Sequence, residues 1–311
     1  MIKSTLMAGA MSMLLASTLA TGAMAQDRVS IGTGGTGGVF YAVGAGMADI
    51  LSRNLEGVSA NAEVTGASVE NVRRVSNGEM TMGFSSASTL YEGKEGTGTF
   101  EGDAQNVAAI AYLYPATLQI AVSAAKALDD VADIGDLKVS VGPPGSNASV
   151  ISERLLTSVD AFNLGRISFL SYGEATGAIQ NGQLDGTFVL AGVPAAALIE
   201  LSTTKDVKLV PVTRAQADAV IADYPFYEFN EIPAGVYAGN DDTIGALGDP
   251  AILFTAADAD PELVYSITKT LFDNLEALGA VHPAAKSMTL AGATATPIAL
   301  HEGAQRYFDE Q

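Results

Sequence analysis

The chain has 311 residues, a formal net charge of −19 and no cysteine. An acidic surface repels nucleic acid and anionic membranes, so neither is expected as a partner. Without cysteine there are no disulfides, thiol nucleophiles or cysteine-linked lipid anchors. Beyond the first 25 residues, no apolar run approaches the roughly 20 residues that a membrane span requires.

Residues 1–25 have the pattern of a secretory signal peptide. Lys3 is their only charge, residues 6–19 are apolar, and Ala23-Met24-Ala25 is a small-residue cleavage site. The segment has no twin-arginine pair. We therefore expect export by the general route, cleavage after Ala25 and a location in a Gram-negative periplasm.

A glycine-rich segment, residues 32–38, follows the first predicted strand and precedes a helical pattern. Gly32, Gly34 and Gly37 form the G-x-G-x-x-G typical of dinucleotide sites, and Glu63 stands where such a site would place its ribose ligand. Enzymes that depend on a cytoplasmic nicotinamide pool are rarely exported. We therefore favour a second interpretation, in which free N–H groups at the helix N-terminus hold a carboxylate.

The rest of the chain alternates between strand and helix patterns, which predicts an α/β fold with largely parallel sheets. Helices are predicted at 68–77 and 149–157, among others. The predicted strands cover residues 29–32, 59–64, 81–84, 107–114, 119–123, 138–141, 167–171, 187–191 and 208–212.

A weak internal repeat suggests two halves of similar construction. Residues 77–84 and 181–188 share the pattern N-G-[EQ]-[ML]-x-x-x-F, which is typical of a helix end, a glycine C-cap and a returning strand. Each copy follows a glycine-rich turn, the second at residues 142–146. We expect a two-lobed clamshell of the periplasmic binding protein type (type II-like), with the ligand in the cleft between the lobes.

The expected domain boundaries follow from this division. Lobe 1 would take residues 26–115 and 225–311, and lobe 2 would take residues 116–224.

Motifs for catalysis or metal binding are weak. His282 and His301 are the only histidines, and neither an H-x-x-x-H nor a G-x-S-x-G occurs. The acidic run at 258–262 is better explained by Asp260 as a helix N-cap with Pro261 at the first helical position than by calcium. We expect a protein that is not an enzyme, with no cofactor, no metal and no catalytic residue.

Several segments together resemble the TAXI-type solute-binding proteins of TRAP (tripartite ATP-independent periplasmic) transporters. The resemblance runs over nearly all of the mature chain and implies capture of a small organic acid, often glutamate or a related dicarboxylate, and delivery to a membrane permease. At residues 83–88 this sequence has serines where the family usually has glutamine and then aspartate. The smaller serine side chains leave room for a ligand with a different terminal group. The segments that carry the resemblance are residues 32–38 with Tyr41, 66–71, 114–119, 139–146, 191–194, 232–237 and 300–304.

The candidate ligand-binding residues lie in these segments. The hydroxyls of Thr33, Thr36 and Tyr41, at the first glycine-rich segment and its helix, can donate to a carboxylate. Helix capping by the threonines and ordinary packing of Tyr41 would also explain these residues. An amide at the lobe crossover, Gln119, can bind one ligand end without carrying charge, or it is an ordinary polar residue at a strand edge. The resemblance favours Asn71. The full set is Thr33, Gly34, Gly35, Thr36, Tyr41, Asn71, Ser85, Ser86, Gln119, Ser146, Asn147, Ala148 and Gly192.

Two other functions fit the same sequence. The clamshell could report its ligand to a membrane kinase, or it could be an exported enzyme acting on a small acid. The second requires a positioned base with a perturbed pKa, and no histidine, cysteine or close acidic pair falls near either glycine turn. A monomer is expected.

Overall fold

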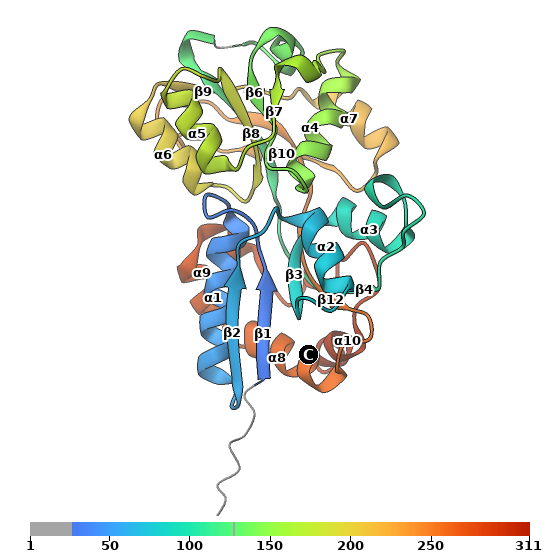
Figure 1. Ribbon diagram of the computed structural model, residues 1–311. Helices are drawn as coiled ribbons and strands as arrows, with labels where there is room; N and C mark the ends of the chain where they lie inside the picture. The colour runs from blue at the N-terminus through green and yellow to red at the C-terminus, as the bar shows by residue number, and fades with distance from the viewer. Residues whose placement is uncertain (1–26, 127) are drawn as a thin grey trace, which may run out of the picture.

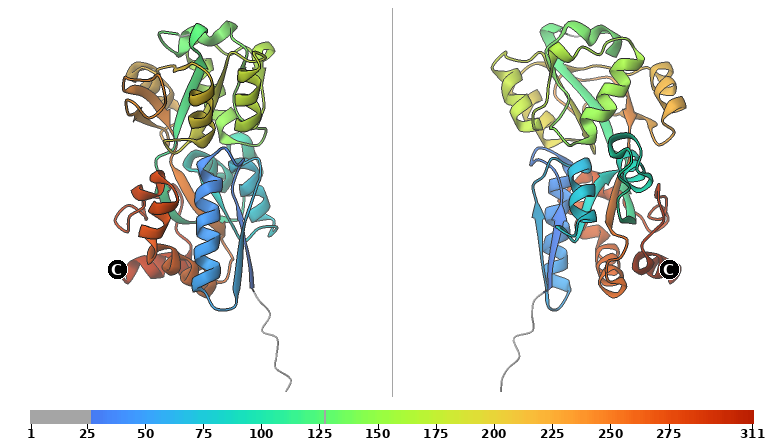
Figure 2. Two further views of the ribbon diagram at one scale, coloured as in Figure 1. Left: turned by 90° about the vertical axis from the view of Figure 1, so that its left-hand side faces the viewer. Right: turned by 45° about the vertical axis from the view of Figure 1, so that its right-hand side comes forward.

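Two β-sheets, each covered by helices, divide the chain into two lobes that lie end to end (Figures 1 and 2). The computed structural model describes residues 27–126 and 128–311. The predicted signal peptide, residues 1–25, lies outside this part of the chain. The two-lobed α/β fold class predicted from the sequence is confirmed.

The first sheet has the strand order β2-β1-β3-β12-β4. β1 runs parallel to β2 and β3, whereas β12 runs antiparallel to β3 and β4. Its strands are β1 (Asp27–Gly32), β2 (Val58–Glu63), β3 (Met82–Ser86), β4 (Val107–Tyr114) and β12 (Ala251–Ala256). The helices of this lobe are α1 (Val39–Asn54), α2 (Ser68–Ser76), α3 (Ala87–Glu95), α8 (Pro261–Phe272), α9 (Leu275–Val281) and α10 (Glu302–Asp309), with short 3-10 turns at Gly98–Phe100 and Pro283–Ser287.

The second sheet has the order β10-β11-β5-β8-β6-β7, and β9 also pairs with β5. Its strands are β5 (Thr117–Ser123), β6 (Val139–Ser140), β7 (Ile167–Ser168), β8 (Gly186–Ala191), β9 (Val207–Leu209), β10 (Glu228–Ile232) and β11 (Ile244–Gly248). The helices are α4 (Asn147–Ser158), α5 (Tyr172–Gln180), α6 (Ala196–Thr204) and α7 (Arg214–Asp223), with 3-10 turns at Ala124–Lys126, Val131–Asp136 and Leu164–Arg166.

Each of the nine predicted strands has a counterpart in the structure, but the prediction of largely parallel sheets is wrong. β5 is antiparallel to all its neighbours, and so is β12. Both strands enter their sheets directly from the other lobe, so each begins at the edge that faces that lobe, where the parallel strands of its own sheet end. Antiparallel pairing follows from that direction.

The two lobes are joined by two chain crossings that lie side by side. β4 leads into β5 through Pro115 and Ala116, and β11 leads into β12 through Asp249 and Pro250. The backbone N–H of Asp249 donates to the carbonyl of Ala116 at 2.9 Å. The sequence predicted that the chain returns from lobe 2 to lobe 1 near residue 225. The β10–β11 hairpin instead belongs to the second sheet, so the chain returns to lobe 1 at residues 249–250.

The repeat appears as two matching helix ends. Asn77 and Asn181 are the C-caps of α2 and α5, and Gly78 and Gly182 follow, both at φ 72°. In each copy, the chain then returns into a strand of its own sheet, β3 or β8. Glycine suits this position because a left-handed backbone strains residues that carry a Cβ.

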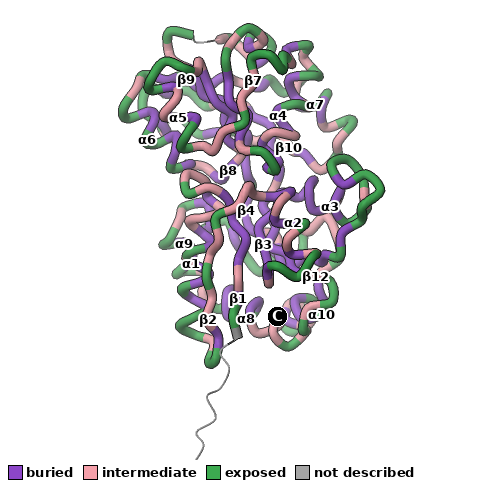
Figure 3. The backbone as a smooth tube through the Cα atoms, viewed as in Figure 1, coloured by how far each residue is buried: buried purple, intermediate pink, exposed green. Residues whose placement is uncertain are grey.

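Buried residues concentrate in the sheets and on the inner faces of the helices (Figure 3). One apolar cluster runs from β1 and α1 through Tyr114 at the crossing to Ala191 and Leu198 in the second lobe. Separate clusters fill the other face of each sheet. Among the described helices, none is long and apolar enough to cross a membrane.

Candidate functional site

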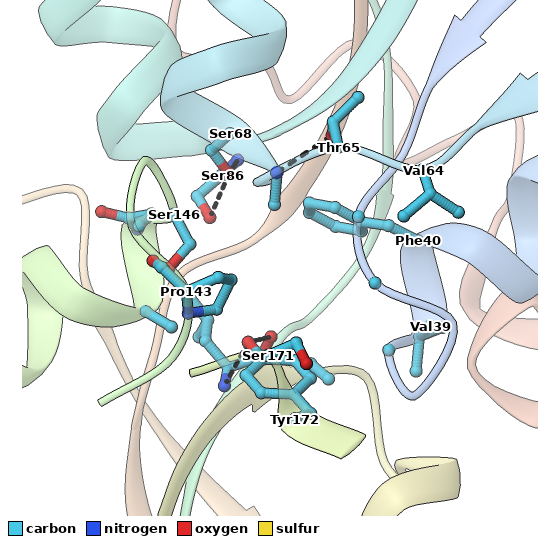
Figure 4. A pocket seen from close by; sticks show the side chains of 18 residues that line it. Val39, Phe40, Val64, Thr65, Ser68, Ser86, Pro143, Ser146, Ser171 and Tyr172 are labelled. Carbon is cyan, nitrogen blue, oxygen red and sulfur yellow. Dashed lines mark hydrogen bonds between the residues drawn. The ribbon is translucent and has the colours of Figure 1, made fainter. Parts of the chain in front are cut away.

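A cavity of about 120 Å³ lies between the lobes (Figure 4). Loops at the carboxyl ends of β1, β2 and β3 form its first wall, and those of β6, β7 and β8 form the opposite wall. This is the position at which open α/β sheets bind ligands. The volume is comparable to the cavity of about 150 Å³ that accepts benzene in an engineered protein core.

Residues of both lobes contribute to the lining. The first lobe provides Gly34, Gly35, Gly38, Val39, Phe40, Val64, Thr65, Ala67, Ser68 and Ser86. The second lobe provides Pro143, Ser146, Asn147, Ala148, Ser171, Tyr172, Leu190 and Ala191. Among these described residues there is no aspartate, glutamate, lysine, arginine or histidine. The cavity therefore does not share the acidity of the whole chain.

Two helices begin at the cavity with their first-turn N–H groups uncapped by any described side chain. The N-cap of α1 is Gly38, which has no side chain, and that of α4 is Ser146, whose hydroxyl donates instead to the carbonyl of Pro143 at 2.7 Å. By contrast, α5 begins with a complete capping box between Ser171 and Glu174. The N-termini of α1 and α4, one from each lobe, are the places suited to an anion.

The remaining wall is apolar. Figure 4 shows Val39, Phe40 and Val64 of the first lobe across the cavity from Tyr172 of the second. The Tyr172 hydroxyl donates to the carbonyl of Leu190 at 3.0 Å, and burial raises its pKa. Tyr172 therefore contributes an aromatic face and no charge at neutral pH. The site combines donors for an anion with a small apolar compartment.

The lobes touch around the cavity. The N–H groups of Val69 and Glu70, in the first turn of α2, donate to the carbonyl of Gly145 in the second lobe at 3.1 and 3.3 Å. The N–H of Ala197 donates to the carbonyl of Gly37 at 3.3 Å. These bonds pair backbone groups of one lobe with those of the other, so they form only when the clamshell is closed.

Side chains behind the cavity also join the lobes. Arg154 on α4 donates to Glu92 on α3 at 2.5 Å and to the Tyr227 hydroxyl at 2.7 Å. Asp249 at the return crossing is fully buried and accepts bonds from Ser88 of α3 and Asn147 of α4. Both groups tie α3 of the first lobe to α4 of the second.

The structure brings six of the predicted site residues together at the cavity. They come from the two glycine-rich turns and the end of β3. They are Gly34, Gly35, Ser86, Ser146, Asn147 and Ala148. Ser86 is held by the Ser68 hydroxyl, which accepts its backbone N–H at 3.1 Å.

Three predicted polar residues are instead buried behind the cavity walls, where they form hydrogen bonds with other groups of the protein. The Thr33 hydroxyl donates to the carbonyl of Glu63 at 2.6 Å. The Asn71 amide donates to the carbonyls of Thr33 and Phe84 at 2.7 and 2.9 Å. Gln119 donates to the carbonyl of Ala191 and accepts from the Tyr237 hydroxyl.

The other four predicted residues also lie outside the lining. The Ser85 hydroxyl donates to the carbonyl of Ser86, and Thr36 is exposed. Tyr41 is half-buried on α1 away from the cavity. Gly192 packs against Tyr114 and Ala284, where an added Cβ would come within 2.7 Å of the alanine side chain.

Sequence reasoning missed much of the lining. Val64, Thr65, Ala67 and Ser68 lie between the end of β2 and the start of α2. The sequence predicts the strand and the helix there, and the resemblance covers residues 66–71, but none of these four residues is a predicted ligand contact. Ser171 and Tyr172 follow β7, and Leu190 lies near the end of β8. Their position at or just after the ends of predicted strands was a usable signal, because the carboxyl ends of parallel strands meet at one edge of a sheet.

The alternative chemistries find little support in the geometry. Glu63, the residue that would bind the ribose in a dinucleotide site, forms an ion pair with Arg74 at 3.2 Å. Asp260 is the N-cap of α8 with Pro261 at its start, as predicted. His301 caps α10 by accepting the N–H of Gly303 at 3.2 Å. Within the described residues no cluster of acidic or histidine side chains could hold a metal ion.

The two lobes and the cavity between them define a two-lobed α/β fold. The sequence pattern of the NMT1-like family matches residues 31–311, so the chain belongs to that family.

Solved structures with little sequence identity have the same fold. A protein of Bordetella bronchiseptica RB50 is 15% identical over 91% of this chain and 88% of its own, with a TM-score of 0.54. The arginine-, lysine-, histidine-binding protein ArtJ from Geobacillus stearothermophilus is 11% identical over 84% of this chain and 94% of its own, with a TM-score of 0.51. The effector-binding domain of QuiR in complex with shikimate is 10% identical over 85% of this chain and 100% of its own, with a TM-score of 0.50.

Proposed function

We propose that this protein is a periplasmic solute receptor that closes its two lobes on a small organic acid and carries out no chemistry on it. The observation that carries the proposal is the cavity itself, which is lined by both lobes and faced by the uncapped N-termini of α1 and α4. The absence of any acidic, basic or histidine side chain among the described lining residues supports binding over catalysis.

The walls favour a compact ligand with one anionic end. Helix N-termini and hydroxyls can hold one carboxylate, while Val39, Phe40, Val64 and Tyr172 can pack against an apolar body. If both helix N-termini bind the same carboxylate, a second carboxylate finds no basic side chain in the described lining. The cavity therefore supports a monocarboxylate better than the glutamate- or dicarboxylate-like ligand that the family resemblance implied.

A ligand panel tests this proposal. Thermal unfolding is measured with short monocarboxylates, dicarboxylates, NAD and NADP. A ligand that binds only the folded state stabilises it by about 2.7 kcal/mol at a hundredfold excess over its Kd. We expect monocarboxylates to raise the melting temperature and the dinucleotides to leave it unchanged. A shift with NAD and with no acid would overturn the proposal.

A matched pair of variants places the effect at the cavity. Gly35 lines it, and a Cβ there would lie 4.0 Å from the nearest atom, so Gly35→Leu can extend a side chain into the space. Thr36→Leu adds the same side chain at the exposed next position. Gly35→Leu should abolish the ligand-induced shift, whereas Thr36→Leu should retain it. Equal shifts in both variants would place the ligand elsewhere.

We further propose delivery to a membrane permease of the TRAP type, a proposal that rests on the resemblance of the glycine-rich segments. The test is uptake of the labelled acid by cells that lack this chain and regain it as wild type or as Gly35→Leu. Uptake should require the wild-type chain and should persist when ATP is depleted while an ion gradient is maintained. Loss of uptake on ATP depletion alone would assign an ATP-driven permease instead.

A further inference from the structure

Asn147 has an amide oxygen with no partner. It is the first residue of α4, lines the cavity and is 2% exposed. Its amide nitrogen donates to Asp249 Oδ2 at 2.6 Å. Its Oδ1 is buried, and no described residue donates to it. An unpaired buried acceptor costs about 1–3 kcal/mol, so this arrangement calls for a donor.

Asp249 dictates which way this amide points. The carboxylate is held from the first lobe, because Ser88 donates to it through its backbone N–H at 3.1 Å and through its hydroxyl at 2.5 Å. An ionised carboxylate can only accept hydrogen bonds. It therefore takes the NH₂ side of the Asn147 amide and leaves the oxygen side for another group.

We propose that Asp249 is a positioning residue that presents the Asn147 amide oxygen to the ligand, so that the ligand carries an N–H or O–H donor beside its carboxylate. The preferred class is a small hydroxy or amino acid. The inference rests on the proposed function, since it assumes that a small acid occupies the cavity. It adds a reason for selectivity between acids of equal size and charge.

The discrimination is expected to be steep. A plain acid of the same shape would leave Oδ1 unpaired, and sites built around a hydrogen bond reject analogues that lack the donor far more strongly than apolar sites reject a missing methylene. A cost of about 1.4 kcal/mol corresponds to tenfold in Kd. We expect at least about tenfold tighter binding of the donor-bearing acid.

The charge on Asp249 gives the selectivity a pH dependence. Burial raises the pKa of Asp249 to about 7. The charged and titratable groups that face it are Arg154 of α4 and Tyr227, and Glu92 of α3 pairs with Arg154. Once protonated, the carboxyl can donate, and the Asn147 amide is free to turn its oxygen toward Asp249. Selectivity for a donor should therefore be high above pH 7 and should decline below it.

The test uses pairs of acids of equal charge that differ in a hydroxyl donor: propionate against lactate, and 3-methylbutanoate against 2-hydroxy-3-methylbutanoate. Alanine and valine, whose donor is a charged ammonium group, are measured beside them. Calorimetric Kd values are compared for wild type, Asn147→Leu and Asp249→Asn, with Ser149→Ala, two residues further along α4 and outside the cavity lining, as a control. Asn147→Leu should abolish the preference for the donor-bearing acid within each pair, whatever its effect on the affinity for the plain acids. Asp249→Asn should lower the selectivity ratio, and Ser149→Ala should keep it.

Each outcome decides one of the two proposals. Equal Kd values within the pairs for the wild type overturn the role of Asn147 and leave the receptor function intact. Absence of binding by every acid, plain or substituted, overturns the receptor function instead. Should a variant fail to fold, the selectivity ratio of the wild type between pH 5.5 and 8.5 decides, because a ratio that is constant across that range contradicts the role of Asp249.

Discussion

Asn71 illustrates how a polar residue near a site can serve the scaffold rather than the ligand. It is completely buried, donates to two backbone carbonyls and accepts the Thr65 hydroxyl at 2.7 Å. These bonds hold the chain leaving β1 against the β2–α2 turn, and both segments carry cavity residues. Its effect on the ligand is therefore indirect.

Asn71→Ala should destabilise the protein by on the order of 3 kcal/mol, because buried carbonyls of Thr33 and Phe84 lose a donor. Denaturant unfolding measures the change. Asn61→Ala, at an exposed position on β2, is the control and should stay within about 0.5 kcal/mol of wild type. A variant with normal stability and at least tenfold weaker binding would make Asn71 a ligand residue after all.

Asp249 should leave a signature in the pH dependence of stability. Its pKa is raised from 3.8 to about 7 by burial, so the folded state holds the proton more tightly than the unfolded state. The stability contributed by the protonated group is present below about pH 4 and is lost as the pH rises through 7. Asp249→Asn removes this titration.

The measurement is the difference in free energy of unfolding between wild type and Asp249→Asn across pH 4 to 8. This difference isolates Asp249 from the many other acidic residues. It should fall by a few kcal/mol, given about 1.4 kcal/mol per pKa unit, and then level off. A difference that is flat across this range would mean that the folded pKa of Asp249 is close to its usual value.

At the scale of elements, the first-turn N–H groups of α2 contact the other lobe and are not free to bind a ligand. Its first-turn N–H groups are taken by the carbonyl of Gly145 from the other lobe. The approach is close: a Cβ on Gly66, just before α2, would lie 2.7 Å from the carbonyl oxygen of Pro144. Glycine is required there because backbone meets backbone across the cleft.

Gly66→Ala should therefore hinder closure while leaving each lobe folded. We expect ligand affinity to fall at least about tenfold, as measured by calorimetry. Gly177→Ala on α5, where a Cβ meets nothing within 4 Å, is the matched control. Unchanged affinity in Gly66→Ala would mean that binding does not need the α2–Gly145 contact.

At the scale of the whole molecule, we expect the lobes to rotate about the two adjacent crossings, which the hydrogen bond from the Asp249 N–H to the Ala116 carbonyl joins. The contacts between the lobes, including Arg154 with Glu92 behind the cavity, form only on closure. We expect the radius of gyration from small-angle scattering to decrease when an acid from the panel that binds wild type is added. Wild type without compaction at saturation would indicate a rigid site, and Gly35→Leu provides the unliganded reference.

Salt should have little effect on binding, despite a net charge of −19. The described lining carries no charged side chain, so the ligand is held by short-range donors that salt screens weakly. Affinity should change by less than about tenfold between low and physiological ionic strength. A much steeper salt dependence would indicate that the ligand forms an ion pair with a cationic side chain outside the described lining.

Local signals predicted much of this fold. The pattern shared by residues 77–84 and 181–188 correctly placed two helix ends and two returning strands, because capping and hydrophobic alternation act over a few residues. The glycine-rich turns likewise placed Gly34, Gly35 and Ser146 at the cavity. The β10–β11 hairpin and β12 were missed, although Gly248-Asp249-Pro250 between β11 and β12 is a turn signal.

By itself, then, the sequence determined the α/β class, the two-lobed division and the glycine turns, since these depend on periodicity and on backbone freedom at named residues. Only the tertiary structure decided which polar groups line the cavity. Thr33, Asn71 and Gln119 have the same hydrogen-bonding groups as cavity residues, yet each is engaged with backbone atoms from a distant segment. Asn147 and Asp249 are 102 positions apart, and they meet because the return crossing runs beside the start of α4. Such pairings depend on how whole elements pack, and no local pattern encodes them.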